Sequence, residues 1–483
     1  MKYNSTNRGS KIFPIVFFVL TAVHHESGRA AGNSLEEEMF GSESKPSPAA
    51  SPSPSASPAP ASAAPQGASP VSASLTDASL VKSNALGEML TLGGRLSIDT
   101  NILKNKDQKL ADAALVHSTA AELYLDARPS DNVRGFIRGT ISSNTGTTAN
   151  PVFSLSETWI KWGSSGALFT TLGKQKLKWG AATFWNPTDF LAVQPKDPLA
   201  DFDVRPGANL LKLHLPIEKS GHNFYALVSM DDSQSAHDPR VAARAEMNYG
   251  LRYLSGELTA TVAGGRKQPQ QFGLDLNTSL GVVDFIAEAA LTKKSKRQFY
   301  KSTTEPDGTR KVTSYSRENE TLSQVVTGLR YDLKYSESDS ANLSIEYFWN
   351  DFGSSDVVSE AMSFIRGQSQ RLYLASRYMG ANLVFVQPGP LNDSTLLLSG
   401  LWNLTDKSWL ARAGWTEKLD MKSNLIVAVT RTGGLGEFTG GIPSSVAENL
   451  RKSQMSPELN AGLDQLEGRS QEWLISLSAN LNL

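Results

Sequence analysis

The pattern that most constrains the fold is an alternation of apolar and polar residues in stretches of about ten, the length typical of membrane-spanning strands. Beyond the N-terminus no apolar run approaches the roughly 20 residues that a transmembrane helix needs. In 409–416, for example, Trp409, Ala411, Ala413 and Trp415 occupy every second position. Successive side chains of a strand point to opposite faces, so each stretch would have one apolar and one polar face. The same alternation recurs in 121–127, 133–139, 329–335 and 343–349.

Three further features favour a membrane barrel over a soluble sandwich, which shows the same alternation. Tryptophans fall near the ends of the predicted strands, where aromatic girdles meet the lipid interfaces: Trp349, Trp402, Trp409, Trp415 and Trp473. The polar faces carry both signs of charge, as a water-filled lumen would. The chain also ends in an alternating strand from Trp473 to Leu483, which resembles the C-terminal signal read by the barrel-assembly machinery, although that signal usually ends in Phe.

Connection lengths predict the number of strands. Bacterial barrels have short periplasmic turns, long outer loops and an even strand number. Short turns are predicted at 128–131, 163–166, 217–221, 251–256, 336–340, 387–393 and 418–422, and long loops at 99–114, 177–205, 293–321, 350–370 and 432–471. With 370–386 kept as one strand, we expect an all-β, antiparallel, up-and-down transmembrane barrel of about 18 strands, with 16 as the alternative and both termini in the periplasm.

The first 84 residues are predicted to comprise an export signal and a tether. Basic residues precede an apolar run at 12–23, and Gly28 and Ala30 supply a small-x-small cleavage site, so residues 1–30 are predicted to be a signal peptide. Residues 31–84 would be a periplasmic acidic segment followed by a disordered Ser/Pro/Ala-rich linker, because such a composition buries little apolar surface. The linker is either a plain tether or a contact with the cell wall. The barrel would span 85–483.

Composition argues against several other functions. The formal net charge is -1, so the chain lacks the excess of basic charge that nucleic-acid binding needs. It contains no cysteine, which excludes thiolate metal sites and cysteine nucleophiles. The histidines beyond residue 30, which are His117, His214, His222 and His237, lie in no recognisable nucleophile motif. We therefore expect no catalytic residue, metal or cofactor.

The most distinctive stretch is 172–207, which contains Gly-Lys-Gln, then Trp-Gly, then Asn-Pro-Thr-Asp. This stretch resembles a family of porin-like bacterial outer-membrane proteins that carry a Gly-Arg-Gln…Trp-Gly…Asn-Pro-x-Asp segment, and 388–409 is similar to later strands of that family. The resemblance covers about residues 85–483. It implies a barrel in the bacterial outer membrane and no particular substrate. Lys174 stands where Arg is usual, which keeps the charge but loses the bidentate fork.

The same stretch would form the third outer loop, between the fifth and sixth strands. If the loop folds inward, it forms a constriction that sorts solutes by charge; the alternative, equally weighted, is a structural latch. Its candidate residues are Lys174, Gln175, Lys176, Lys178, Trp179, Asn186, Asp189, Asp197 and Arg205. Candidate lumen residues are Glu122, Asp126, Arg134, Arg138, Lys212, Arg330, Glu346, Arg377 and Arg412.

The sequence thus predicts a channel for passive or weakly selective passage of small solutes. Its partners would be outer-membrane lipids, the assembly machinery and the solutes themselves. A structural or surface-display barrel with a plugged lumen is the alternative, and an outer-membrane enzyme is a weaker one.

Overall fold

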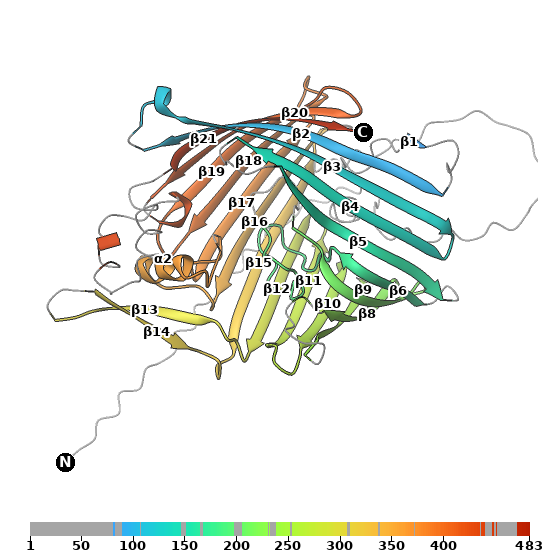
Figure 1. The fold of residues 1–483 in the computed structure, drawn as a ribbon, viewed down its shortest axis with the longest axis horizontal. Coiled ribbons are helices and arrows are strands. Elements are labelled where there is room, and N and C mark those ends of the chain that lie inside the picture. The colour runs from blue at the N-terminus through green and yellow to red at the C-terminus, as the bar shows by residue number, and fades with distance from the viewer. Residues whose placement is uncertain are drawn as a thin grey trace, which may run out of the picture.

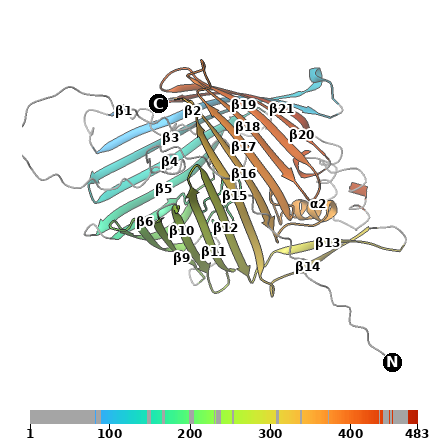
Figure 2. The same cartoon turned by 180° about the vertical axis from the view of Figure 1, so that it is seen from behind.

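The computed structural model describes residues 81–82, 89–106, 108–145, 151–164, 168–197, 205–229, 231, 238–251, 254–306, 310–336, 339–370, 372–434, 436–439, 447–448, 451 and 471–483. The predicted signal peptide and almost all of the predicted linker lie outside these residues. The described chain forms one antiparallel sheet that curls into a closed barrel (Figures 1 and 2).

Eighteen strands make up the barrel. The first nine are β2 (Leu90–Asn105), β3 (Ala114–Ser130), β4 (Val133–Asn144), β5 (Val152–Ser164), β6 (Leu168–Gln175), β7 (Ala208–Ile217), β8 (His222–Ser229), β9 (Arg240–Leu251) and β10 (Leu254–Gly264). The second nine are β11 (Gln270–Leu280), β12 (Val283–Lys293), β15 (Leu322–Lys334), β16 (Ser340–Asn350), β17 (Arg377–Val386), β18 (Ser394–Asn403), β19 (Trp409–Lys418), β20 (Ser423–Gly433) and β21 (Gln471–Asn482). The predicted count of 18 is confirmed.

Each of these strands pairs with its neighbour along the chain, and β2 pairs with β21 to close the barrel. Closure leaves no open edge in the sheet, as a membrane-spanning sheet requires. The short two-residue strand β1 (Val81–Lys82) pairs with the start of β2. The first barrel strand begins, and the last one ends, at the end of the barrel that carries the short turns.

The predicted connections largely match the observed ones, with omissions where the breaks in the pattern are small. The structure adds a short turn at 281–282, where Gly281 has a φ of 70°. At the opposite end of the barrel it also adds connections at 145–151, 230–239, 265–269 and 404–408. Residues 377–386 form a single strand, as the alternation of long and short connections requires.

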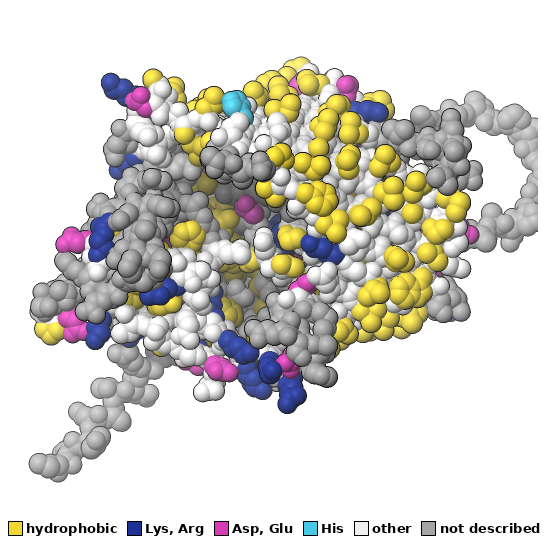
Figure 3. Space-filling model, viewed as in Figure 1, with side chains coloured by type: hydrophobic (Ala, Val, Ile, Leu, Met, Phe, Trp, Pro, Cys, Tyr) yellow, Lys and Arg dark blue, Asp and Glu magenta, His cyan; other side chains and the backbone are white. Residues whose placement is uncertain are grey.

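The two faces of the wall differ as the sequence pattern predicts. Outward positions carry exposed apolar side chains such as Leu329, Ile345, Leu398 and Leu477, which are 54%, 37%, 49% and 46% exposed. Figure 3 shows hydrophobic side chains crowding the outer surface over β3, β4 and β5, and a hollow at the centre of the view. An apolar outer band around a polar interior is the arrangement of a barrel that sits in lipid.

The connections at the end opposite the short turns contain secondary structure of their own. A hairpin of β13 (Gln298–Thr304) and β14 (Arg310–Ser316) projects from the wall between β12 and β15 (Figure 1). The helix α2 (Val357–Ile365) lies in the connection between β16 and β17, and its N-terminus is capped by Asp356, which accepts from Ser359 N. Two short 3-10 turns are η1 (Leu110–Asp112) and η2 (Glu437–Thr439). Within the described chain, no helix has the length and apolar character needed to cross a membrane.

Candidate functional site

The inward face of the wall carries charged side chains of both signs. Strand register places eight of the nine lumen candidates on this face: Glu122, Asp126, Arg134, Arg138, Lys212, Arg330, Glu346 and Arg412. Arg377 is the exception, because it pairs with Trp349 on the outward face and its guanidinium lies 5.9 Å from that ring. Its assignment to the lumen is therefore wrong. As the first residue of β17, Arg377 can lay its stem on the apolar surface while its charge stays near water.

Ion pairs cover the wall formed by β3, β4 and β5. Arg134 bonds Asp126 with a nitrogen–oxygen distance of 2.9 Å, and Arg138 lies 3.3 Å from Glu157. Three rings stack beside these pairs, with successive centroids 5.9 and 5.3 Å apart: Tyr124, Phe136 and Trp159. This part of the lumen is thus polar, with much of its charge balanced locally.

The long connection between β6 and β7 folds into the barrel over its described residues, 176–197 and 205–207; we call these residues the inner loop. Its Ala182, Phe184 and Trp185 are fully buried. They pack in one cluster with inward-facing residues of the far wall, among them Ile286 of β12 and Phe348 of β16. In the barrel order β16 stands seven strands beyond β7, counting β8, β9, β10, β11, β12, β15 and β16. The inner loop therefore crosses the lumen rather than lying outside it.

A buried carboxylate on β16 holds the middle of the inner loop. Glu346 Oε1 accepts from Thr183 N at 2.5 Å, and Glu346 Oε2 accepts from Phe184 N at 2.8 Å. Glu346 is only 1% exposed. The same loop segment is bonded from two more directions, because Arg330 donates to Thr183 Oγ1 at 3.2 Å and Lys196 Nζ donates to Thr183 O at 2.6 Å.

A second buried carboxylate, Glu288 of β12, holds the segments on either side. Its Oε1 accepts from Ala182 N at 2.6 Å and its Oε2 accepts from Thr188 Oγ1 at 3.1 Å. Glu288 is also 1% exposed. Gly180, with a φ of 96°, leaves room for it: a Cβ there would lie 2.7 Å from both carboxylate oxygens. No local sequence pattern identifies Glu288 or its contacts with the inner loop, because a glutamate at an inward strand position looks like any other lumen residue.

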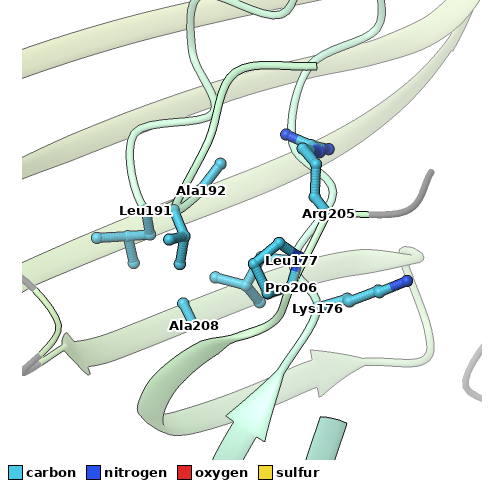
Figure 4. Close-up of a pocket in the computed structure, with 8 residues that line it drawn as sticks. Lys176, Leu177, Leu191, Ala192, Arg205, Pro206 and Ala208 are labelled. Carbon is cyan, nitrogen blue, oxygen red and sulfur yellow. The ribbon is translucent and has the colours of Figure 1, made fainter. Parts of the chain in front are cut away.

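The C-terminal end of the inner loop is tied to the middle of the loop, and its N-terminal end is tied to the near wall. Arg205 NH1 lies 3.0 Å from Asp189 Oδ2, an ion pair that is largely buried on both sides. The Arg244 guanidinium lies 5.2 Å from the Trp179 ring. Figure 4 shows Lys176 and Arg205 at the small cavity between these ends, whose volume of about 10 Å³ has room for a single water and not for a solute.

The remaining loop candidates fall in different places. Lys174 is still part of β6, pairs with the outward-facing Thr158 and donates to Leu155 O at 2.6 Å, so it does not belong to the constriction. Gln175 is buried on the inward face and donates to Leu210 O at 3.4 Å. Asn186 donates to Ala182 O at 3.1 Å and so closes a turn within the inner loop. Lys176 and Lys178 are half-buried at its start, and Asp197 is exposed.

Two other connections, between β16 and β17 and between β20 and β21, fold inward and meet the inner loop. Trp185 Nε1 donates to Leu372 O at 3.1 Å, and Tyr373 OH donates to Lys196 O at 3.2 Å. Phe438 of η2 belongs to the same buried cluster as Trp185. The three residues of η2, 437–439, are all buried. The inner loop is therefore supported both by strands of the wall and by the two connections that fold inward.

A cluster of buried carboxyl groups joins these two connections to the one between β18 and β19. Glu437 Oε2 accepts from Tyr378 OH at 2.6 Å and from Asn403 Nδ2 at 3.0 Å, and Glu437 N donates to Asp406 Oδ2 at 2.7 Å. Glu360 of α2 accepts from Asn403 Nδ2 at 3.4 Å. Burial, together with the charges of neighbouring carboxylates, raises the pKa of Glu360 to about 10, and burial raises the pKa of Glu437 to about 7. Each of these two carboxyls therefore keeps its proton to a higher pH than an ordinary glutamate does.

No protein-family model matches the chain, and no curated protein matches its sequence. Among solved structures, the chain is similar to OprB of Pseudomonas putida, with 8% identity, a TM-score of 0.44 and coverage of 82% of this chain and 94% of that one. It is similar to OccK2 (OpdF) of Pseudomonas aeruginosa, with 12% identity, a TM-score of 0.47 and coverage of 81% and 98%. It is also similar to the outer-membrane channel DcaP of Acinetobacter baumannii, with 11% identity, a TM-score of 0.41 and coverage of 83% and 99%.

Proposed function

We propose that this protein is a channel of the bacterial outer membrane through which small solutes diffuse, with the inner loop setting its narrowest point. The observation that carries the proposal is a closed barrel of 18 strands, apolar outside and charged inside, with one connection folded across its lumen. Barrels of 16–18 strands leave room for an aqueous path, whereas a barrel of about eight strands is filled by side chains.

In the proposed orientation the end with the short turns faces the periplasm, together with both ends of the barrel domain, and the long connections face outward. Exported residues 31–84 would then lie in the periplasm as a tether.

The distribution of charge supports weak sorting of solutes. The inner loop carries Lys176, Lys178 and Lys196, while inward positions of the far wall carry carboxylates such as Asp284 and Asp332. Opposite signs on two sides of a constriction produce a field across the path. Most of the wall pairs are neutralised locally, so we expect a modest preference between ions rather than exclusion of one sign.

Single-channel recording in planar bilayers tests this function. Purified protein should give stepwise conductance for small ions, and small uncharged organic solutes should permeate proteoliposomes. Deleting most of the inner loop should raise conductance and weaken ion preference. Replacing Lys176 and Lys178 by Glu should shift preference toward cations, most strongly at low salt, where the Debye length is about 30 Å at 0.01 M.

The same recordings decide against the alternatives. A folded barrel without conductance would support a plugged structural or display barrel. Conductance that does not respond to loop deletion would retain the channel and contradict the role of the inner loop as its constriction.

A further inference from the structure

We infer that Glu288 and Glu346 are positioning residues that hold the inner loop in the lumen and so fix the bore of the channel. The effect on the bore of the channel rests on the proposed function. The role of the two glutamates in holding the loop rests only on the geometry of the docked loop. Neither residue is needed to build the wall, because strand pairing there uses backbone groups only.

Backbone donors of the inner loop match side-chain acceptors of the far wall. The consecutive amides of Ala182, Thr183 and Phe184 all point to carboxylate oxygens of the far wall, at 2.6, 2.5 and 2.8 Å. A backbone N–H can only donate a hydrogen bond, and a carboxyl group offers two oxygens that accept. Since each oxygen of Glu346 takes one of two successive amides, the pair fixes the orientation of the loop backbone as well as its position.

The far wall also fits the docked loop sterically, because it has glycines where loop side chains contact it. A Cβ at Gly380 of β17 would lie 2.8 Å from the Phe184 ring, and a Cβ at Gly273 of β11 would lie 3.0 Å from Thr188 and 3.1 Å from Phe190. Both glycines occupy inward positions of their strands. The wall is therefore thinned where loop side chains press against it, and the carboxylates act at a contact that also fits sterically.

Together these contacts favour one docked state over a set of released ones. Leaving a buried donor without its acceptor shifts such an equilibrium by about fivefold to a hundredfold. Replacing Glu by Gln removes one acceptor and turns an NH₂ group toward an amide that is itself a donor. The double variant Glu288→Gln/Glu346→Gln should therefore release the loop while keeping side-chain volume.

The experiment compares this double variant with Glu122→Gln. Glu122 is also an inward carboxylate, with the Arg138 guanidinium 4.0 Å away, and it lies on β3, away from the docked segment. Each protein also carries Val193→Cys, a position of the inner loop that is 48% exposed, and a spin label can be attached there selectively because the chain has no other cysteine. Heat-modifiable gel mobility confirms that each barrel is folded.

We expect the double variant to show a more mobile label, larger and noisier single-channel conductance and passage of larger uncharged solutes, none of which should appear in Glu122→Gln. An immobile label together with unchanged conductance in a folded double variant would overturn the inference. If the double variant does not fold, Thr188→Val, which removes only the hydroxyl donor to Glu288, must show the label mobility on its own. If the parent protein does not conduct, the proposed function fails, and label mobility still decides whether the carboxylates position the loop.

Discussion

The assignment of the two faces of the wall makes a quantitative prediction at neighbouring residues of β19. Ala413 pairs with Leu398 and Val429 on the outward face, between Trp409 and Trp415. At about 3.3 Å per residue and a tilt of about 40°, it lies about 10 Å in height from the loop end of the strand and about 13 Å from the turn end. Those heights put it close to the middle of an apolar band about 25 Å tall.

An arginine at this depth on the lipid face costs about 2–4 kcal/mol, so Ala413→Arg should lower the free energy of unfolding by that amount. The matched control is Gly414→Arg. A Cβ at Gly414 would meet Leu397 and Ala428 only at 3.7 and 4.0 Å, and the longer side chain would reach into the lumen. The loss at Gly414 should therefore be much smaller.

Urea titration of refolded protein in lipid vesicles, followed by tryptophan fluorescence, measures both free energies. Equal losses at the two positions, or a larger loss at Gly414, would refute the facing of β19 and with it the inside–outside assignment of every strand paired in register with it.

Three further predictions concern other parts of the chain. Deletion of 44–74 should leave the heat-modifiable compact form intact, because that composition buries little apolar surface; loss of the compact form would reveal a folding role. N-terminal sequencing of protein from the outer-membrane fraction should begin near Ala31, and an intact Met1 in the cytosol would contradict export. Because the pKa values of Glu360 and Glu437 are raised, the stability that the protonated cluster contributes is complete below their ordinary values and is lost as pH rises through about 7 toward about 10. A spin label at the exposed position Arg366, next to α2, should become mobile over that range, and Glu360→Gln should suppress the upper part of the change; a pH-independent spectrum in the parent would contradict the linkage.

Period-two patterning was sufficient to predict the barrel, because each strand shows its own two faces locally. The facing of Ala413 and the inward course of strands such as β3 follow from residues within a single stretch. Arg377 was misplaced because it begins a strand directly after a long connection, where the phase of the alternation has few residues behind it. The turn at Gly281 was missed because two residues interrupt the pattern too briefly.

The docking of the inner loop could be suspected from its prolines, tryptophans and Asn-Pro-Thr-Asp turn, but its anchors could not. Glu288 and Glu346 recognise backbone amides, which every residue has, so the sequence of the loop carries no complementary signal. The clustering of Glu360 with Glu437 likewise depends on three connections meeting at one end of the barrel. Such contacts follow from closure of the sheet rather than from any local pattern.

The anchors of the inner loop also impose an order on assembly. Ala182 is 106 residues from Glu288, and Thr183 is 163 residues from Glu346, so the loop has nothing to dock on until most later strands are in place. Contacts of such long sequence separation form late, because the entropy of closing the intervening chain must be met first. Both anchors nevertheless precede closure of the wall, because β17, β18, β19, β20 and β21 still follow β16 in the chain before β21 can join β2. Docking of the inner loop and closure of the wall are therefore separate steps, and docking does not have to wait for closure.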